Sequence, residues 1–302
     1  MKHPDPRGDD LGDRVKAFES VGTKTKLPAG QPIMVRLDGR SFHVLTRRCA
    51  RPFDPGLRAA MVETARAVAE ETNATLAYTQ SDEINLVLPP IVEGGNQGYF
   101  GGRVQKIQSC LASRASVVFN ALIPTHLPQL LPGIKPSNLP VFDCRVWAVP
   151  GEAEAVEAIL WREIDARVNA VSQVGHTHFK GRKLEGVSSQ GIKLLLEEKG
   201  VNYKEFPLEY RRGVYLQRRR VTRGFTAEER ENPFVQRKLA AEPDLQVTRN
   251  ELAPLDMPPF ALVTNAADVI FRGAVPEIPP RVETALVGRP PQERGASPCP
   301  TP

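Results

Sequence analysis

Apolar residues in the first half of the chain follow strand-like and helix-like spacings in turn. A short apolar run ends at Asp38-Gly39, which is typical of a buried strand that stops at a turn. Apolar positions three and four residues apart predict two amphipathic helices. The expected strands are 32–37, 75–79, 84–88 and 139–149, and the expected helices are 56–72 and 103–122.

The resulting order, strand-helix-strand-strand-helix-strand, is typical of a ferredoxin-like α+β fold, an antiparallel sheet with helices on one face. In the second half the spacing predicts helices over 152–174 and 188–199, a strand over 213–221 and a strand around 268–271. A length of 302 residues favours two domains. We expect a first domain over 1–150, a smaller basic α+β domain over 151–275 and a tail over 276–302.

Composition excludes several classes of protein. No apolar run approaches the roughly 18 residues of a membrane helix, and the polar start of the chain does not resemble a secretion signal. The four cysteines are far apart and form no Cys-x-x-Cys pair, so neither a zinc site nor a disulfide framework is indicated. We therefore expect a cytoplasmic protein without a membrane partner.

The positive charge is concentrated in one segment. Residues 175–225 hold twelve Lys or Arg and five Glu, whereas the whole chain has a net charge of only +5. A local excess of this size is typical of contact with phosphates. Residues 276–302 contain eight prolines and few large apolar residues, which predicts a disordered tail.

Three carboxylates are expected at one end of the sheet. In the ferredoxin-like order the first strand and the central hairpin are neighbours, so Asp38 can approach Asp82 and Glu83. Carboxylates that converge repel one another unless a cation joins them, and an all-oxygen set favours Mg²⁺. The alternative is that Asp38-Gly39 is an ordinary turn and residues 81–83 are a solvated loop.

Other residues near these acids are suited to phosphate. Gly39 allows a ligand to approach the backbone closely, and Arg103 and Lys106 place two cations at a helix start. A solvated helix face is the alternative for this pair. The sequence contains no P-loop and no Rossmann glycine motif.

Five separate motifs, in this order, resemble the tRNA(His) guanylyltransferase family and its bacterial-type relatives, the 3′-to-5′ RNA polymerases. They are VRLDGRSFH at 35–43, YTQSDE at 78–83, FGGRVQK at 100–106, FDCRV at 142–146 and WREID at 161–165. The resemblance covers residues from about 15 to about 225 and implies a polymerase-type palm catalytic domain within 1–150.

The resemblance also implies roles for individual residues. Two Mg²⁺ ions would be held by Asp38, the Gly39 carbonyl and Asp82 with Glu83 beside them, and the three acidic residues would be catalytic. The implied nucleotide-binding residues are Asp38, Gly39, Arg40, Ser41, Phe42, His43, Ser81, Asp82, Arg103 and Lys106. Residues of the basic segment would bind tRNA, namely Lys180, Arg182, Lys183, Arg211, Arg212, Arg218, Arg219 and Arg220.

The implied reaction has two steps, activation of an RNA 5′-monophosphate by ATP and attack of the GTP 3′-hydroxyl on the activated end. The family also suggests a homotetramer. The segment 167–173, RVNAVSQ, departs from the pattern of the tRNA(His)-specific eukaryotic enzymes, so template-directed repair of tRNA 5′ ends is an alternative. A palm-type nucleotide cyclase and a non-catalytic RNA-binding protein are two further alternatives.

Overall fold

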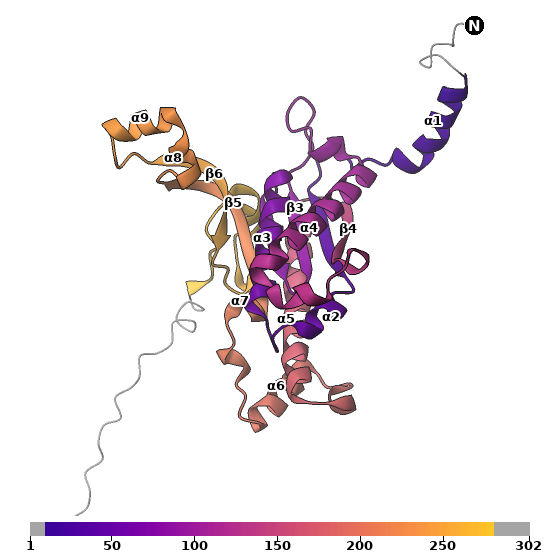
Figure 1. The fold of residues 1–302 in the computed structure, drawn as a ribbon, viewed down its shortest axis with the longest axis vertical. Coiled ribbons are helices and arrows are strands. Elements are labelled where there is room, and N and C mark those ends of the chain that lie inside the picture. The colour runs from indigo at the N-terminus through magenta and orange to yellow at the C-terminus, as the bar shows by residue number, and fades with distance from the viewer. Residues whose placement is uncertain (1–9, 281–302) are drawn as a thin grey trace, which may run out of the picture.

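The protein is built on one antiparallel sheet of six strands in the order β4-β1-β3-β2-β5-β6 (Figure 1). The computed structural model describes residues 10–280. The strands are β1 (Ile33–Arg40), β2 (Leu76–Gln80), β3 (Glu83–Leu88), β4 (Val141–Ala148), β5 (Val214–Arg223) and β6 (Val247–Leu255). The helices are α1 (Asp10–Thr23), α2 (Phe42–Leu45), α3 (Pro55–Glu71), α4 (Val104–His126), α5 (Glu152–His178), α6 (Ser189–Glu198), α7 (Leu208–Arg212), α8 (Ala227–Glu231), α9 (Pro233–Ala241) and α10 (Ala266–Arg272).

The first half has the ferredoxin-like arrangement that the spacing of its apolar residues predicts. Its four strands alternate with α3 and α4, and both helices pack on one face of the sheet around Val35, Leu37 and Phe119. Asp54 begins α3 by accepting a hydrogen bond of 3.0 Å from the Leu57 N–H, and a proline follows it at the first helical position. The α+β palm fold is thereby confirmed.

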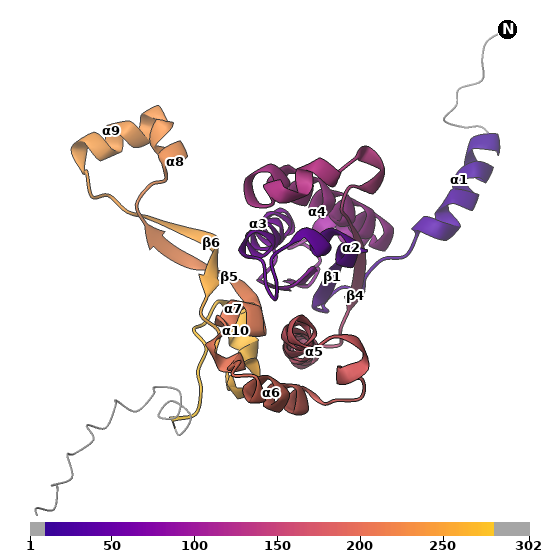
Figure 2. The same cartoon turned by 60° about the horizontal axis from the view of Figure 1, so that its bottom comes forward.

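The opposite face of the sheet is covered as well. The apolar side chains of Met34, Tyr78 and Val87 point to this face and form a second core with Ile159 of α5 and Val269 of α10. Figure 2 shows α5 on the other side of the strands from α3 and α4. Helix α5 therefore covers the face of the sheet opposite α3 and α4.

The prediction of a strand around 268–271 is wrong, because these residues belong to helix α10. Ala266, Val269 and Ile270 are three and four residues apart and are all buried in the second core. A short apolar run fits either a strand or one face of a helix, and here the helical spacing decides. Strand β6, which the sequence analysis did not predict, completes the sheet beside β5.

Strands from both halves of the chain share the sheet. Strand β5 pairs with β2 of the first half from Thr79↔Val214 to Leu76↔Gln217. The domain boundary at residue 150 remains a prediction. Most of the predicted tail over 276–302 lies outside the described residues. In residues 10–280 no helix has the length and hydropathy to cross a membrane. The three cysteines in this range are free thiols.

Candidate active site

Two aspartates that are 44 positions apart in the sequence meet at one end of the sheet. Asp38 lies near the end of β1, and Asp82 lies in the turn between β2 and β3. The pairing of β1 with β3 sets Asp38 opposite Glu83, and the Gly39 N–H donates a hydrogen bond of 3.0 Å to the carbonyl of Asp82. Ser81 adopts a left-handed φ of 55°, which tightens this turn. The strand register therefore brings the two aspartates together.

Glycine is required after Asp38 by local packing. A Cβ at Gly39 would lie 2.5 Å from the ring of Phe42, which is buried against Phe119 and Phe142 at centroid distances of 5.1 Å. The aromatic cluster thus fixes the chain that follows Asp38. Phe42, implied as a nucleotide-binding residue, has its ring in this core.

The electrostatics of the site are those of crowded acids. Burial raises the pKa of Asp38, and the neighbouring Asp82, Glu83 and Asp143 raise it further. Burial also raises the pKa of Asp82. Hydrogen bonds from the Asp82 backbone and from Ser81 lower this pKa in part, and so does the nearby His43. The aspartate side chains are therefore in an environment in which a bound cation would be stabilised.

Glu83 is held by an arginine of α5. Arg162 donates two hydrogen bonds to its carboxylate, of 2.7 and 2.6 Å, and a third of 3.0 Å to Asp165. The guanidinium also lies over the Trp161 ring, 4.4 Å from its centroid, and only 12% of the Arg162 side chain is exposed. Asn85 donates to the same carboxylate at 2.8 Å. This bidentate clamp fixes the position of Glu83 beside the two aspartates.

A cavity of about 400 Å³ opens between the hairpin and α5. Asp38, Asp82 and Glu83 line it from the sheet, and Arg162, Asp165, Asn169 and Gln173 line it from the helix. Sequence reasoning placed none of the four helical residues in the site. Their spacing of three and four positions, which puts them on one face of a helix, is the signal that could have identified this wall.

The other residues implied in nucleotide binding are divided among several places. Arg40 and Ser41 line a neighbouring hollow of about 680 Å³, together with Arg48. The side chain of His43 is exposed and lies close enough to Asp82 to affect its pKa. Ser81 lines the cavity together with Asp82.

Arg103 and Lys106 lie at the other end of the sheet. The first turn of α4 is attached to the N-terminal segment through the Val104 N–H, which donates to the Thr25 carbonyl at 3.0 Å. The part of α4 near the site is some 13 residues later, where Ser116 accepts from the Phe142 N–H opposite Gly39. At 1.5 Å per residue the separation is about 20 Å. Within one chain, the structure does not bring Arg103 and Lys106 to the two aspartates.

The predicted RNA-binding residues fall on two surfaces. Lys180, Arg182 and Lys183 lie in the turn after α5, whereas Arg218, Arg219 and Arg220 lie on β5. The remaining two, Arg211 and Arg212, lie in α7 and are half-buried. Arg211 donates to the Phe206 carbonyl at 2.6 Å, and Nε and Nη1 of Arg212 are buried without a hydrogen-bond partner among the described residues.

The carboxylates fit Mg²⁺ as an ion that shares its ligands with a substrate. No group of three or more His, Cys, Asp and Glu side chains among residues 10–280 is arranged to hold a metal by itself. Asp38 and Asp82 remain available, since Arg162 engages Glu83. Mg²⁺ usually takes one or two carboxylates and completes its shell with water and phosphate oxygens, so this donor set fits the ion.

Comparisons with known proteins agree with this geometry. A sequence model described as tRNAHis guanylyltransferase matches residues 12–150. A Drosophila melanogaster protein named "Probable tRNA(His) guanylyltransferase" is 31% identical over 208 residues, which are 64% of this chain and 68% of the relative. The tRNA(His) guanylyltransferase of Candida glabrata is 28% identical and is covered over 87% of its length, against 67% of this chain.

Solved structures give the same result. A bacterial tRNA(His) guanylyltransferase-like protein in complex with ATP superposes with a TM-score of 0.63 and 32% identity, over 70% of this chain and 87% of that one. One in complex with GTP has a TM-score of 0.63 and 25% identity, over 84% and 94%. The chain belongs to the tRNA(His) guanylyltransferase family, a family of nucleotidyltransferases.

Proposed function

We propose that the protein adds nucleotides to the 5′ end of tRNA, extending the strand in the 3′-to-5′ direction. The observation that carries this proposal is the convergence of Asp38 and Asp82 on a cavity at the end of a palm sheet. The related structures in complex with ATP and with GTP support nucleoside triphosphates as substrates. The basic surfaces on β5 and after α5 support an RNA substrate.

The proposed chemistry has two displacements at phosphorus. In the first, an oxygen of the RNA 5′-monophosphate attacks the α-phosphorus of ATP and pyrophosphate leaves. In the second, the 3′-hydroxyl of GTP attacks the 5′ phosphorus of the adenylylated RNA, its proton is lost and AMP leaves. In both displacements negative charge develops on the oxygens of the attacked phosphoryl group and of the leaving group, so one site that neutralises such charge can serve each step in turn.

Each group in the cavity has a place in this proposal. Asp38, Asp82 and the Gly39 carbonyl would hold two Mg²⁺ ions, which supply charge neutralisation and lower the pKa of a bound hydroxyl. Arg162 holds the Glu83 carboxylate next to Asp82 and places a positive charge against the repulsion among the three acids. The Ser81 hydroxyl donates to Asp82 and so helps to orient that carboxylate at the wall of the cavity.

The direct test uses 5′-monophosphorylated tRNA that lacks its first nucleotide, with ATP, labelled GTP and Mg²⁺. Label joined to the RNA is expected. Cyclic product from nucleotide alone would support a cyclase instead, and RNA binding without any product would support a non-catalytic protein. Supplying the four labelled triphosphates separately, on tRNA(His) and on another truncated tRNA, distinguishes selective guanylyl addition from template-directed repair.

Removal of the clamp on Glu83 should slow nucleotide addition. Arg162→Gln is expected to lower kcat about 10- to 100-fold, because Glu83 loses its bidentate partner and the aspartates lose their fixed geometry. Arg162→Lys keeps the positive charge but cannot donate two parallel hydrogen bonds to the carboxylate, so it should recover only part of the rate. The exposed Arg14→Gln is the matched control and should leave kcat unchanged. A wild-type kcat in Arg162→Gln would show that the clamp has no part in positioning.

A further inference from the structure

A long two-stranded arm extends from the body of the molecule. After β5 leaves its pairing with β2 at Gln217, it continues with β6 alone to Arg223↔Val247, and α8 and α9 connect the two strands at the far end. Figures 1 and 2 both show this arm projecting away from α3 and α4. Residues 219–251 of the arm contribute no buried side chain to the apolar cores. Packing of the core therefore does not explain why the arm is there.

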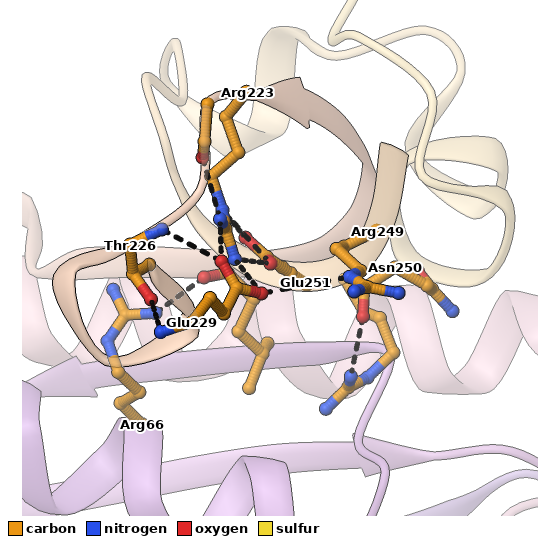
Figure 3. Close-up of polar contacts among 10 residues, drawn as sticks. Arg66, Arg223, Thr226, Glu229, Arg249, Asn250 and Glu251 are labelled. Carbon is orange, nitrogen blue, oxygen red and sulfur yellow. Dashed lines mark hydrogen bonds and ion pairs between the residues drawn. The ribbon is translucent and has the colours of Figure 1, made fainter. Parts of the chain in front are cut away.

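Ion pairs hold the far part of the arm in one conformation. Arg223 lies between two carboxylates and donates to Glu229 at 2.6 Å and to both oxygens of Glu251 at 3.1 Å (Figure 3). Arg249 approaches Glu229 at 3.8 Å from the neighbouring strand. The Thr226 hydroxyl accepts from the Glu229 N–H at 3.2 Å and so caps α8. These contacts fix α8 against the strands.

The base of the arm is attached to α3 by arginines that donate to carbonyl groups. Arg66 donates to the Leu252 carbonyl, and Arg218 donates to the carbonyls of Ala74 and Ala69 at 3.0 and 3.3 Å. The arm therefore holds a defined position relative to the sheet, and hence relative to the cavity at the other end of β2.

Five arginines surround a hollow of about 400 Å³ at this base. We call it the arginine hollow, and it is formed by Arg218, Arg219, Arg220, Arg249 and Arg272. Among the described residues that line it there is no Asp or Glu. Thr75, Thr248 and Asn250 also line it and supply neutral hydrogen-bonding groups. Its chemistry is therefore that of a site for several phosphate groups.

The positive charge of the hollow is only partly compensated. Arg272 pairs with Glu152 at 3.0 Å and with Asp268 at 3.2 Å. Arg219 donates to the Pro254 carbonyl at 3.2 Å, which leaves its charge without a counterion in residues 10–280. Arg220 is exposed and has neither an ion pair nor a side-chain hydrogen bond there. Arg219 and Arg220 are the residues best placed to bind an external anion.

The hollow and the active site lie at opposite ends of β2. Thr75, just before this strand, lines the hollow, and Ser81, just after it, lines the cavity. Six residues of extended chain span about 20 Å. Successive phosphates along one strand of a duplex are roughly 3 Å apart in the axial direction, so this distance corresponds to about six or seven nucleotides.

We propose that the arginine hollow binds the sugar-phosphate backbone of duplex RNA several nucleotides from the 5′ end that is being extended. The inference rests on the proposed function, since it takes the 5′ end to lie in the cavity. Contacts to phosphates and 2′-hydroxyls carry no sequence information. The hollow thus sets the register of the duplex on the enzyme while base pairing or the cavity selects the nucleotide.

The experiment measures the Kd of the full chain for 5′-monophosphorylated tRNA between 50 and 200 mM salt by fluorescence anisotropy. In Arg219→Gln/Arg220→Gln the Kd at 100 mM salt is expected to rise roughly tenfold or more, and the slope of log K against log salt should fall by about 2. Arg237→Gln/Lys238→Gln removes the same charge from the exposed face of α9 and is the matched control. Its Kd and slope should equal those of the wild type.

Two further measurements separate the possible failures. If Lys180→Gln/Arg182→Gln lowers the slope and the Arg219/Arg220 variant does not, the duplex lies on the surface after α5 and the inference is overturned. If the Arg219/Arg220 variant keeps its Kd but changes the molecular mass measured by light scattering, the hollow binds a second copy of the chain, which also overturns it. Failure of the proposed function would look different, because wild-type protein would then join no nucleotide to any RNA.

Discussion

Asp82→Asn is expected to lower nucleotide addition by about a thousandfold or more. The side chain of Asp82 is one of two carboxylates that face the cavity without an arginine partner, and asparagine removes its charge with almost no change in size. Loss of one charged ligand to a metal or to a developing transition-state charge costs several kcal/mol, and each 1.36 kcal/mol is a factor of ten in rate. Single-turnover addition to truncated tRNA measures this loss directly.

An exposed aspartate elsewhere in the chain provides a matched control for this variant. Asp244→Asn changes the same residue type at an exposed position of the arm and should leave the rate unaltered. The tRNA affinity of Asp82→Asn should not fall below that of the wild type, because the arginines proposed to bind the RNA backbone lie about 20 Å away at the far end of β2. A variant that keeps a tenth of the wild-type rate would remove Asp82 from the catalytic machinery.

The convergence of Asp38 and Asp82 could be predicted because it depends only on topology. Once the order of elements indicates a ferredoxin-like sheet, β1 and β3 must be neighbours, and the register of two short antiparallel strands leaves little freedom at their ends. The sixth strand, in contrast, could not be predicted from the sequence pattern. Strand β6 has polar residues on both faces of the arm, so no alternation of apolar residues marks it.

One physical cause keeps Arg103 and Lys106 away from the two aspartates within one chain. Strand β3 begins beside Asp38 and runs away from it, so the helix that follows must start at the opposite end of the sheet. Arg103 and Lys106 lie in the first turn of that helix and remain there. The contact between Arg162 and Glu83 could not be predicted, because the two residues are 79 positions apart and are brought together only by the packing of α5 on the sheet.

Glu163→Ala is expected to destabilise the protein by about 3 to 5 kcal/mol. This carboxylate is 1% exposed, accepts 2.9 Å from the Tyr215 hydroxyl and 3.3 Å from the Phe260 N–H, and so joins α5 to β5 and to the segment before α10. Alanine would leave both donors unpaired and create a cavity in the second core. Urea unfolding measures the loss. The exposed Glu157→Ala on the same helix should change the free energy of unfolding by less than about 0.5 kcal/mol.

The pH dependence of the same group has a definite sign. Burial raises the pKa of Glu163 above its ordinary value of 4.5, against hydrogen bonds from Tyr215 and Phe260. The folded state then holds the proton more tightly than the unfolded state, so the stabilisation from this proton is complete below pH 4.5 and is lost as the pH rises through the folded-state pKa. Glu163→Gln cannot titrate, and the wild type should therefore lose stability relative to this variant as the pH rises from 4.5. A relative gain over that interval would mean that Tyr215, Phe260 and the nearby arginines outweigh the cost of burial, and that the carboxylate is held ionised in the core.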